Sequence, residues 1–384
     1  MRPGMKRIWF HALAIALSLS MHGPAGLAHA EDGVSDNEIR IGMANALSGP
    51  AAGLGSQLKI GAEAHFAEVN AAGGINGRRI ALISLDDGYE PARSVAATKT
   101  LIEKHKAFVL FGYVGTPASV AAVQLAVKAN VPYLFPFTGA EFLRNPVKPL
   151  VFNVRASYFD EAEAIVAYVT KDLGMKKIAL FLQDDAFGEA VKAGVMRALG
   201  ARGMKPTEEV RYPRNTLDVD DGLAKIQAAQ PEAVVFVGTY DPLSSIVKKA
   251  RAKAMTTIFL TVSFIGTSDF IESAGTDGDG VYISQVVPSP EDTSIPLVEQ
   301  YQLAMQGAKP DYTSLEGYID AVVLVEALKK APNPPTRAGL VSTLSTFGGN
   351  LGGFMVNFSA STHQGSESVF LIRVKDGRAV PVQR

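Results

Sequence analysis

The chain has 384 residues, 47% of them hydrophobic and 20% charged, which is long enough for one large domain or two of ordinary size. The formal net charge is −1, and without the three basic residues of the first thirty it is −4, from 34 Lys and Arg against 38 Asp and Glu. Such a balance gives no excess of positive charge for a phosphate backbone, so nucleic acid is not an expected partner. The absence of cysteine excludes disulfides and a lipid-modified cysteine.

The first thirty residues have the three parts of an export signal. A basic start is followed by an apolar stretch at residues 8–21, too short to span a bilayer, and Ala28-His29-Ala30 fits the A-x-A cleavage pattern. A membrane anchor or an ordinary core helix is the alternative. We expect residues 1–30 to be a signal peptide and the mature chain to be a soluble periplasmic protein, not a lipoprotein. No later stretch has the eighteen or more apolar residues of a membrane span.

Residues 38–87 are predicted to form a strand, a crossover helix and a second strand. The apolar run Ile39–Ala46 ends at a Ser-Gly-Pro break, and residues 58–69 place apolar side chains on one helical face. After a turn, Arg79–Leu85 reads as a buried strand that ends on two aspartates. The loop at residues 48–55 is expected at the carboxyl end of the first strand, where open α/β sheets bind small ligands.

Helix and strand signals keep alternating beyond residue 87. The predicted helices are 91–105, 117–129, 158–173, 187–202, 219–229 and 242–254. The predicted strands are 108–111, 132–136, 177–182, 209–212, 233–237 and 257–262. This order is typical of a doubly wound parallel sheet repeated in two halves, so the predicted fold class is α/β.

The segment after residue 280 breaks this alternation. A strand-like run at 281–286 precedes helices predicted at 296–305, 315–330 and 337–344, and strand-like runs follow at 354–358 and 368–374. Asp376-Gly377 is predicted to be the hairpin turn to a last strand at 379–382. Glycine-rich segments near Gly275–Gly280 and Gly348–Gly353 are predicted to carry the chain between two lobes.

Motifs for catalysis are weak. Residues 53–58 lack the third glycine of a dinucleotide-binding fingerprint, and neither a Walker A motif nor a G-x-S-x-G elbow occurs. The histidines beyond the first thirty residues are isolated and lack H-E-x-x-H spacing, which argues against zinc. Asp86-Asp87 and Asp184-Asp185 are open to an acid/base interpretation, although acidic residues at strand ends more commonly cap helices or face solvent. We expect no enzyme activity, no metal and no cofactor.

Three segments carry a resemblance to a known family: LSGPAAGLGSQLKIGAEAHFAEVNAAGGINGRRIALISLDD at residues 47–87, then Asp184–Glu189 and Gly238–Pro242. They resemble the periplasmic leucine/isoleucine/valine-binding proteins, the solute receptors of ATP-driven importers, over nearly all of the mature chain. The resemblance implies the type I fold of periplasmic binding proteins, with two doubly wound α/β lobes joined by three crossings that close over a ligand. It also implies permease subunits of an ABC importer as partners.

The division into lobes is predicted from the same resemblance. We expect residues 31–150 plus 281–348 to form lobe 1 and residues 151–280 plus 349–384 to form lobe 2. Lobe 1 is expected to supply the ligand-binding loops, and the protein is expected to be a monomer.

The resemblance implies that two loops of the first lobe, residues 112–116 and 136–140, hold the ligand's carboxylate. The candidate residues are Tyr113, Gly115, Thr116, Phe137, Thr138 and Gly139. The threonine hydroxyls can donate, and glycine lets backbone N–H groups approach an anion closely. Thr116 before Pro117 equally fits a helix cap, and capping and anion binding are compatible at a helix N-terminus.

Further candidates come from positions where the family places aromatic or acidic side chains. Tyr240 matches an aromatic residue against the ligand, Phe187 stands where a tyrosine is usual, and Leu54 occupies a position that is often aromatic. Tyr158, after the first predicted crossing, is expected to reach the same cleft. Each aromatic side chain is also open to core packing. Phe264 lies where amino-acid-binding members have an acidic residue.

This last substitution bears on specificity, because residues 261–266 contain no carboxylate. A desolvated ammonium without a counter-charge is costly, so a free α-amino acid fits poorly unless Asp185, Asp241 or a carboxylate elsewhere compensates. We predict a small, partly apolar ligand such as an aromatic or aliphatic carboxylate. The expected function is capture of this solute by hinge closure for an importer. The alternative is a periplasmic ligand-sensing module of the same fold that regulates a partner receptor.

Overall fold

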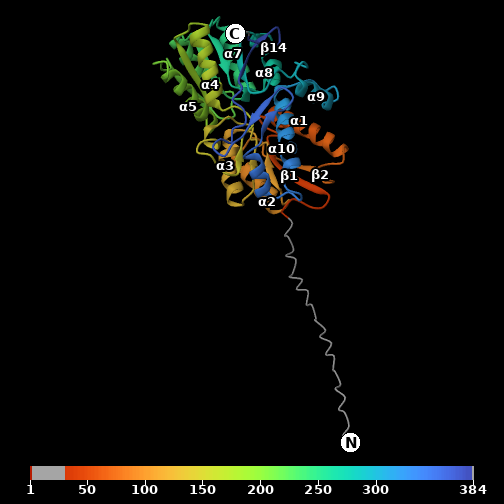
Figure 1. Cartoon of the computed structure of the whole chain (residues 1–384). Helices are drawn as coiled ribbons and strands as arrows, with labels where there is room; N and C mark the ends of the chain where they lie inside the picture. The colour runs from red at the N-terminus through yellow and green to blue at the C-terminus, as the bar shows by residue number, and fades with distance from the viewer. Residues whose placement is uncertain (2–30, 383–384) are drawn as a thin grey trace. The chain divides into compact units, whose positions relative to one another are not determined.

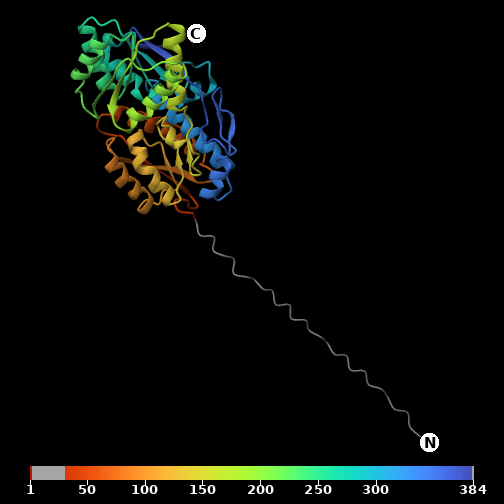
Figure 2. The same ribbon diagram turned by 90° about the vertical axis from the view of Figure 1, so that its left-hand side faces the viewer.

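The computed structural model describes Met1 and residues 31–382, so the predicted signal peptide lies outside the described residues. Residues from Glu31 onward form one compact unit. Its strands are divided between two large sheets, coloured red to yellow and green to blue in Figure 1, and Figure 2 shows the same separation from the side. The predicted α/β fold with two parallel-sheet lobes is confirmed.

The first sheet has the strand order β2-β1-β3-β4-β5, and all of its pairs are parallel. Its strands are β1 (Glu38–Asn45), β2 (Arg79–Asp86), β3 (Val109–Phe111), β4 (Tyr133–Leu134) and β5 (Val151–Phe152). They are connected by α1 (Ala52–Ala71), α2 (Pro91–Glu103) and α3 (Thr116–Lys128). Because β2 and β3 lie on opposite sides of β1, the strand order reverses there, and open sheets bind ligands at such a switch point.

A helix from late in the chain completes this lobe. Helix α10 (Tyr312–Lys330) lies along α1, as Figure 1 shows. A Cβ atom on Gly61 would be 1.8 Å from the carbonyl oxygen of Ser314, and one on Gly317 would be 2.1 Å from that of Leu58. The two helices therefore touch backbone to backbone at glycines. Helix α9 (Pro296–Ala304) also contacts α1, and α11 (Arg337–Leu344) contacts α10.

The second sheet has the order β14-β13-β10-β9-β8-β6-β7. The parallel strands are β6 (Ile178–Asp184), β7 (Glu209–Pro213), β8 (Ala233–Val237), β9 (Ile258–Thr261) and β10 (Tyr282–Gln285). Its helices are α4 (Tyr158–Ala167), α5 (Ala186–Gly200), α6 (Asp220–Ala229), α7 (Tyr240–Ala252) and α8 (Thr267–Ala274). An antiparallel hairpin of β13 (Phe370–Lys375) and β14 (Arg378–Pro381) forms one edge. Its turn at Asp376 and Gly377, both with positive φ, confirms the predicted hairpin.

Within residues 31–382 the chain passes between the lobes after β5, after β10 and before β13. The crossing predicted at Gly275–Gly280 is wrong, because this segment joins α8 to β10 within the second lobe. The crossing predicted at Gly348–Gly353 is also wrong, because this segment contains β11 (Gly348–Asn350) and most of the turn to β12 (Met355–Asn357), and these two strands pair as a small antiparallel sheet. Strand β10 belongs to the second sheet, although the sequence assigned residues from 281 onward to the first lobe.

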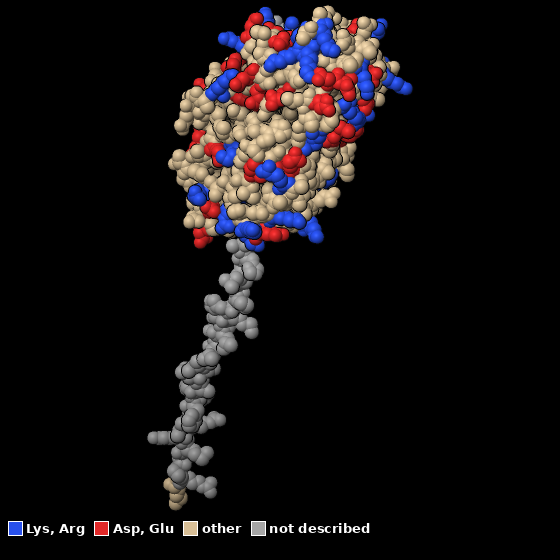
Figure 3. Space-filling view, turned by 180° about the vertical axis from the view of Figure 1, so that it is seen from behind, with Lys and Arg blue, Asp and Glu red and all other residues tan. Residues whose placement is uncertain are grey.

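The surface shows the near balance of charge in the sequence. On the face in Figure 3, Lys and Arg are interspersed with Asp and Glu over the described part of the chain. No helix among the described residues is both long enough and apolar enough to cross a membrane.

Candidate ligand-binding site

The loops that follow β3 and β4 bring Thr116 and Thr138 together. Their Oγ1 atoms are 2.7 Å apart, and the Thr138 hydroxyl donates to the Tyr158 hydroxyl at 3.4 Å. All three side chains are buried. The two loops run side by side because Val114 and Phe137 form a parallel bridge. Three of the residues singled out in the sequence thus form one buried group of hydroxyls at the carboxyl edge of the first sheet.

Gly115 and Gly139 allow close packing around these hydroxyls. Gly115 has φ of +96°, and a Cβ atom there would be 2.4 Å from the ring of Tyr89. A Cβ atom on Gly139 would be 2.6 Å from both the backbone nitrogen and the ring of Tyr158. Both glycines are therefore required by sterics, and their contact with a ligand stays a prediction.

Aromatic rings from both lobes meet beside the hydroxyl group. Phe264, which follows β9, lies 5.6 Å from Phe137 and 4.7 Å from Phe187, measured between ring centroids. Tyr158 is 5.5 Å from Phe187, and Tyr89 of the first lobe is 5.9 Å from Phe264. All five rings are buried. We call these five side chains the aromatic cluster.

Leu54 and Tyr240 lie at the edge of this cluster. Leu54 belongs to the same buried apolar group, whereas Tyr240 is half-buried at the start of α7. A Cβ atom on Gly266 would be 3.0 Å from the Leu54 side chain and 3.3 Å from the Tyr240 ring. Burial raises the pKa of the Tyr240 hydroxyl, and the backbone of Gly53 opposes this shift. Tyr240 of the second lobe thus covers the first turn of α1 in the first lobe.

Tyr113 is not brought together with the other candidates. Its ring lies 4.9 Å from that of Tyr133, and its hydroxyl is 2.9 Å from the hydroxyl of Thr98, in a separate apolar group of the first lobe. The side chain of its neighbour Val114 joins the apolar group of the aromatic cluster instead. Burial raises the pKa of the Tyr113 hydroxyl. Only the backbone of Tyr113 therefore lies in the candidate loop.

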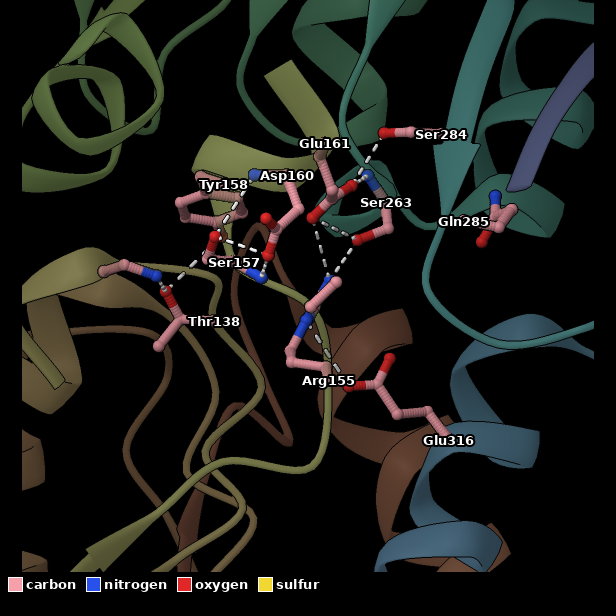
Figure 4. A network of polar contacts seen from close by, with 12 residues as sticks. Thr138, Arg155, Ser157, Tyr158, Asp160, Glu161, Ser263, Ser284, Gln285 and Glu316 are labelled. Atoms are coloured by element: carbon pink, nitrogen blue, oxygen red, sulfur yellow. Dashed lines mark hydrogen bonds and ion pairs between the residues drawn. The ribbon is translucent and has the colours of Figure 1, made fainter. Parts of the chain in front are cut away.

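A buried guanidinium lies against the aromatic cluster. The Arg155 guanidinium carbon, from the segment between β5 and α4, is 4.6 Å from the centroid of the Phe137 ring. Its Nη2 lies 3.5 Å from Glu161 Oε1 and donates to the Ser263 hydroxyl. Its Nε lies 3.5 Å from Glu316 Oε1. Figure 4 shows Arg155 between Glu161 and Ser263 of the second lobe on one side and Glu316 of α10 on the other. We call these four residues the ionic network.

Residues 261–266 contain no carboxylate, but Glu161 of α4 brings one into contact with this segment at Ser263. Its Oε2 accepts from the Ser263 backbone nitrogen at 2.8 Å and from the Ser284 hydroxyl at 2.7 Å. Its Oε1 accepts from the Ser263 hydroxyl at 3.1 Å. Burial raises the pKa of Glu161, although Arg155 and the serine donors oppose this shift. Both oxygens of this carboxylate are therefore engaged within the protein.

Arg144 fixes the backbone around the site. Its Nη1 donates to the carbonyl oxygens of Thr138 at 3.3 Å and Ala140 at 3.1 Å. Its Nη2 donates to those of Arg155 at 3.1 Å and Ala156 at 3.4 Å. Burial lowers the pKa of Arg144 to about 10, so the side chain is still charged at neutral pH. One guanidinium thus ties the second candidate loop to the first crossing.

The other carboxylates near the site have partners or lie at its edge. Asp185 caps α5 by accepting from the backbone nitrogens of Phe187 and Gly188, at 2.9 and 3.1 Å, which agrees with the capping interpretation. Asp241 accepts from the Ser273 hydroxyl at 3.0 Å. Asp269 is half-buried near Gly53, and burial raises its pKa to about 6. Among the described residues, no group of three or more His, Asp or Glu is placed to hold a metal ion.

Comparison with known proteins identifies the family. A family model described as periplasmic binding protein matches residues 38–379. The chain belongs to the periplasmic binding protein family. The family resemblance inferred from the sequence is thereby confirmed, and so is the expectation that the chain is a binding protein and not an enzyme.

Named relatives and a solved structure agree with this assignment. An amino acid binding protein of Pseudomonas aeruginosa is 26% identical over 310 residues, which cover 78% of this chain and 81% of the relative. A leucine-, isoleucine-, valine-, threonine- and alanine-binding protein of the same species is 23% identical over 388 residues and covers 98% of this chain and 100% of its own. The crystal structure of a possible leucine/isoleucine/valine-binding protein from Rhodopirellula baltica has a TM-score of 0.86 and 33% identity, covering 93% of this chain and 98% of that one.

In this periplasmic binding protein, sequence analysis missed Tyr89, Arg144, Arg155 and Glu161. The signal available for Arg155 was its place two residues before Ser157, the N-cap of α4, in a segment that is buried. A buried arginine requires partners. Tyr89, in the loop between β2 and α2, and Glu161 of α4 reach the site through contacts that only the assembled lobes create.

Proposed function

We propose that this protein is the periplasmic receptor of an ABC importer that binds a small, partly apolar solute between its lobes and delivers it to permease subunits. The observation that carries the proposal is the buried hydroxyl group of Thr116, Thr138 and Tyr158 next to aromatic rings from both lobes. The names of relatives that bind amino acids support a small solute that carries a carboxylate. Residues 1–30 serve as the signal peptide in this proposal.

The expected mechanism is closure of the lobes around the bound solute. Phe137 and the two threonines come from the first lobe, and Phe187 and Phe264 come from the second. A ligand in contact with both sets favours the closed arrangement by its differential affinity, and permease subunits can then recognise that arrangement.

The chemistry around the site favours a carboxylate with an apolar body. Hydroxyls and glycine-flanked backbone amides suit an anionic group, and aromatic rings suit an aliphatic or aromatic remainder. A free ammonium group has less support, because Glu161 is already engaged by Ser263, Ser284 and Arg155. Asp269 at the edge of the site is the remaining carboxylate for such a group.

A thermal-shift screen of residues 31–384 tests the proposal. The panel contains benzoate, phenylacetate, hexanoate, leucine and phenylalanine, and we expect a carboxylate to raise the melting temperature by mass action, equivalent to about 2.7 kcal/mol at 100 times its Kd. Thr138→Val should remove the shift. Thr343→Val is the matched control, because that hydroxyl bonds only within α11, to the Gly339 carbonyl oxygen.

Two results would contradict the proposal. One is a screen in which neither the acids nor the amino acids change the melting temperature. The other is a Thr138→Val variant that keeps the full ligand-induced shift. Uptake of the bound compound by cells with and without the gene separates import from ligand sensing, because a sensing module would leave uptake unchanged.

A further inference from the structure

Arg155 is placed where both lobes and the candidate site meet. Its side chain is 1% exposed, its guanidinium stacks on Phe137, and Phe137 is followed by Thr138 of the hydroxyl group. On the other side it contacts Ser263, the neighbour of Phe264 in the aromatic cluster. The guanidinium is thus in direct contact with the Phe137 ring of the candidate site and with the residue that precedes Phe264.

The hydrogen bonds of this guanidinium are incomplete. An arginine has five N–H donors, and in the described part of the chain only Nη2 of Arg155 makes hydrogen bonds, to Glu161 and Ser263. Nε and Nη1 are buried and make no hydrogen bond with the described residues, but Nε lies 3.5 Å from Glu316 Oε1 as an ion pair, so Nη1 is the group left without a partner among them. A buried N–H donor without an acceptor destabilises the folded state by its full desolvation cost. Arginine has no acceptor atom, so only an incoming acceptor can remove this cost. The site therefore has donors that suit a ligand oxygen.

Arg155 keeps its positive charge among buried carboxyl groups. Burial raises the pKa of Glu316 to about 7, and it raises the pKa of Asp320 well above its ordinary value. Although burial opposes it, Glu316 and Glu161 raise the pKa of Arg155, so the guanidinium keeps its charge. Glu161 and Glu316 are its two ion-pair partners among the described residues. At the unbonded Nη1, a ligand carboxylate would be attracted to this cation and an ammonium group would be repelled by it.

We propose that Arg155 is a specificity-determining residue that binds the ligand's carboxylate and selects acids over their neutral amides. The inference rests on the proposed function, since it assigns a role in the same site. A carboxylate at Nη1 would receive charge-assisted hydrogen bonds, which are stronger than those to a neutral amide oxygen. Thr138 follows Phe137, on which the guanidinium stacks, and its hydroxyl can donate to the same ligand carboxylate.

Paired ligands test this assignment with a readout that a structural role would not change. Kd values are measured by calorimetry on residues 31–384 for benzoate and benzamide, phenylacetate and phenylacetamide, and hexanoate and hexanamide. We expect the wild-type protein to bind at least one acid more tightly than its amide by on the order of 30-fold or more. Arg155→Met should reduce this ratio about tenfold or more, and Arg155→Lys should keep part of it.

Arg197→Met is the matched control. Its guanidinium also stacks on a phenylalanine, with the Cζ atom 5.1 Å from the Phe159 ring centroid, but it is exposed on α5. The acid-to-amide ratio should be unchanged in this variant. Circular dichroism and melting temperature establish whether each variant is folded.

Each outcome decides between the two proposals. If acids bind but the wild-type ratio is near one, or if Arg155→Met weakens acid and amide equally, the role of Arg155 is refuted and the proposed function stands. If no acid and no amino acid binds, the proposed function fails and the role of Arg155 fails with it. If Arg155→Met does not fold, the wild-type ratio and Arg155→Lys still decide.

Discussion

Arg214, in the loop that follows β7 of the second lobe, donates from Nη1 to both carboxylate oxygens of Glu90 in the first lobe, at 3.1 and 3.2 Å. The same guanidinium stacks on the Tyr89 ring at 4.6 Å and donates to the Tyr89 carbonyl oxygen. Asn215 adds a bond of 2.8 Å to Glu90. These contacts join the lobes beside the aromatic cluster, so they must break when the lobes separate.

Replacing Arg214 should therefore weaken the closed arrangement. For Arg214→Gln we expect ligand affinity to fall by about 1 kcal/mol, or roughly fivefold, because the Glu90 side chain is 48% exposed and exposed pairs contribute little. The loss should appear as faster ligand dissociation, measured by stopped-flow fluorescence or surface plasmon resonance. Lys192→Met is the control, since the Lys192–Glu209 pair at 2.7 Å lies within the second lobe. An unchanged dissociation rate in Arg214→Gln would show that this pair does not hold the lobes together.

Arg144 provides a second prediction, on the backbone of the site. Arg144→Lys keeps a positive charge but loses the planar fork that donates to four backbone carbonyl oxygens. Since buried acceptors would lose partners, we expect a loss of about 2–3 kcal/mol in unfolding free energy, measured by urea denaturation. Arg251→Lys is a suitable comparison, because Arg251 also donates to carbonyl oxygens but within the second lobe. Equal stability of Arg144→Lys and the wild type would contradict this role.

The fold was largely predictable because its strands are buried, apolar and separated by amphipathic helices. The strand β8 and the helix α11 have the bounds that the sequence predicted, Ala233–Val237 and Arg337–Leu344. The strand β5 has two residues, Val151–Phe152, which is too short to leave a recognisable pattern. The crossings were misplaced because glycine marks a turn in the backbone, as at Gly275 with φ of +60°, and does not show which sheet receives the next strand.

Only the site residues at strand ends or within family motifs were predictable from the sequence. Thr116 and Thr138 follow β3 and β4, which pair with each other in parallel, so the two strand ends place them together. The sequence assigned the side chain of Tyr113 to the site, but the side chain of Val114 faces the site instead. Successive residues of an extended segment point to opposite sides, so Tyr113 points away. Arg155 and Glu316 are brought together by long-range packing of α10, for which the sequence contains no spacing rule.

The contact of α1 with α10 gives a third prediction. Gly317→Ala places a methyl group 2.1 Å from the Leu58 carbonyl oxygen, so the helices must move apart. We expect a loss of about 2–3 kcal/mol or more in unfolding free energy, by the usual cost of overpacking. Gly200→Ala at the end of α5 is the control, because no atom lies within 4 Å of the added Cβ. Its stability should be unchanged or slightly higher. Comparable melting temperatures for Gly317→Ala and the wild type would refute the close backbone contact.

Asp269 gives the last prediction, which concerns pH. Burial, followed by repulsion from Asp311, Glu272 and Asp241, raises the pKa of Asp269 to about 6 from an ordinary value of 3.8. The folded state therefore binds this proton more tightly than the unfolded state does. Its contribution to stability is complete below about pH 4 and is lost as the pH rises through 6.

Asp269→Asn removes this titration while keeping the shape of the side chain. We expect the variant to gain unfolding free energy relative to the wild type as the pH rises from 4.5 to 7.5, with the steepest change near pH 5, between the two pKa values, and a plateau above about pH 7. Urea denaturation at four pH values measures the difference, and Asp376→Asn is the control, because Asp376 is exposed in the β13–β14 turn. Solvent reduces the size of the effect, since Asp269 is only half-buried. A difference between Asp269→Asn and wild type that stays constant over this range would mean that Asp269 ionises normally beside α1.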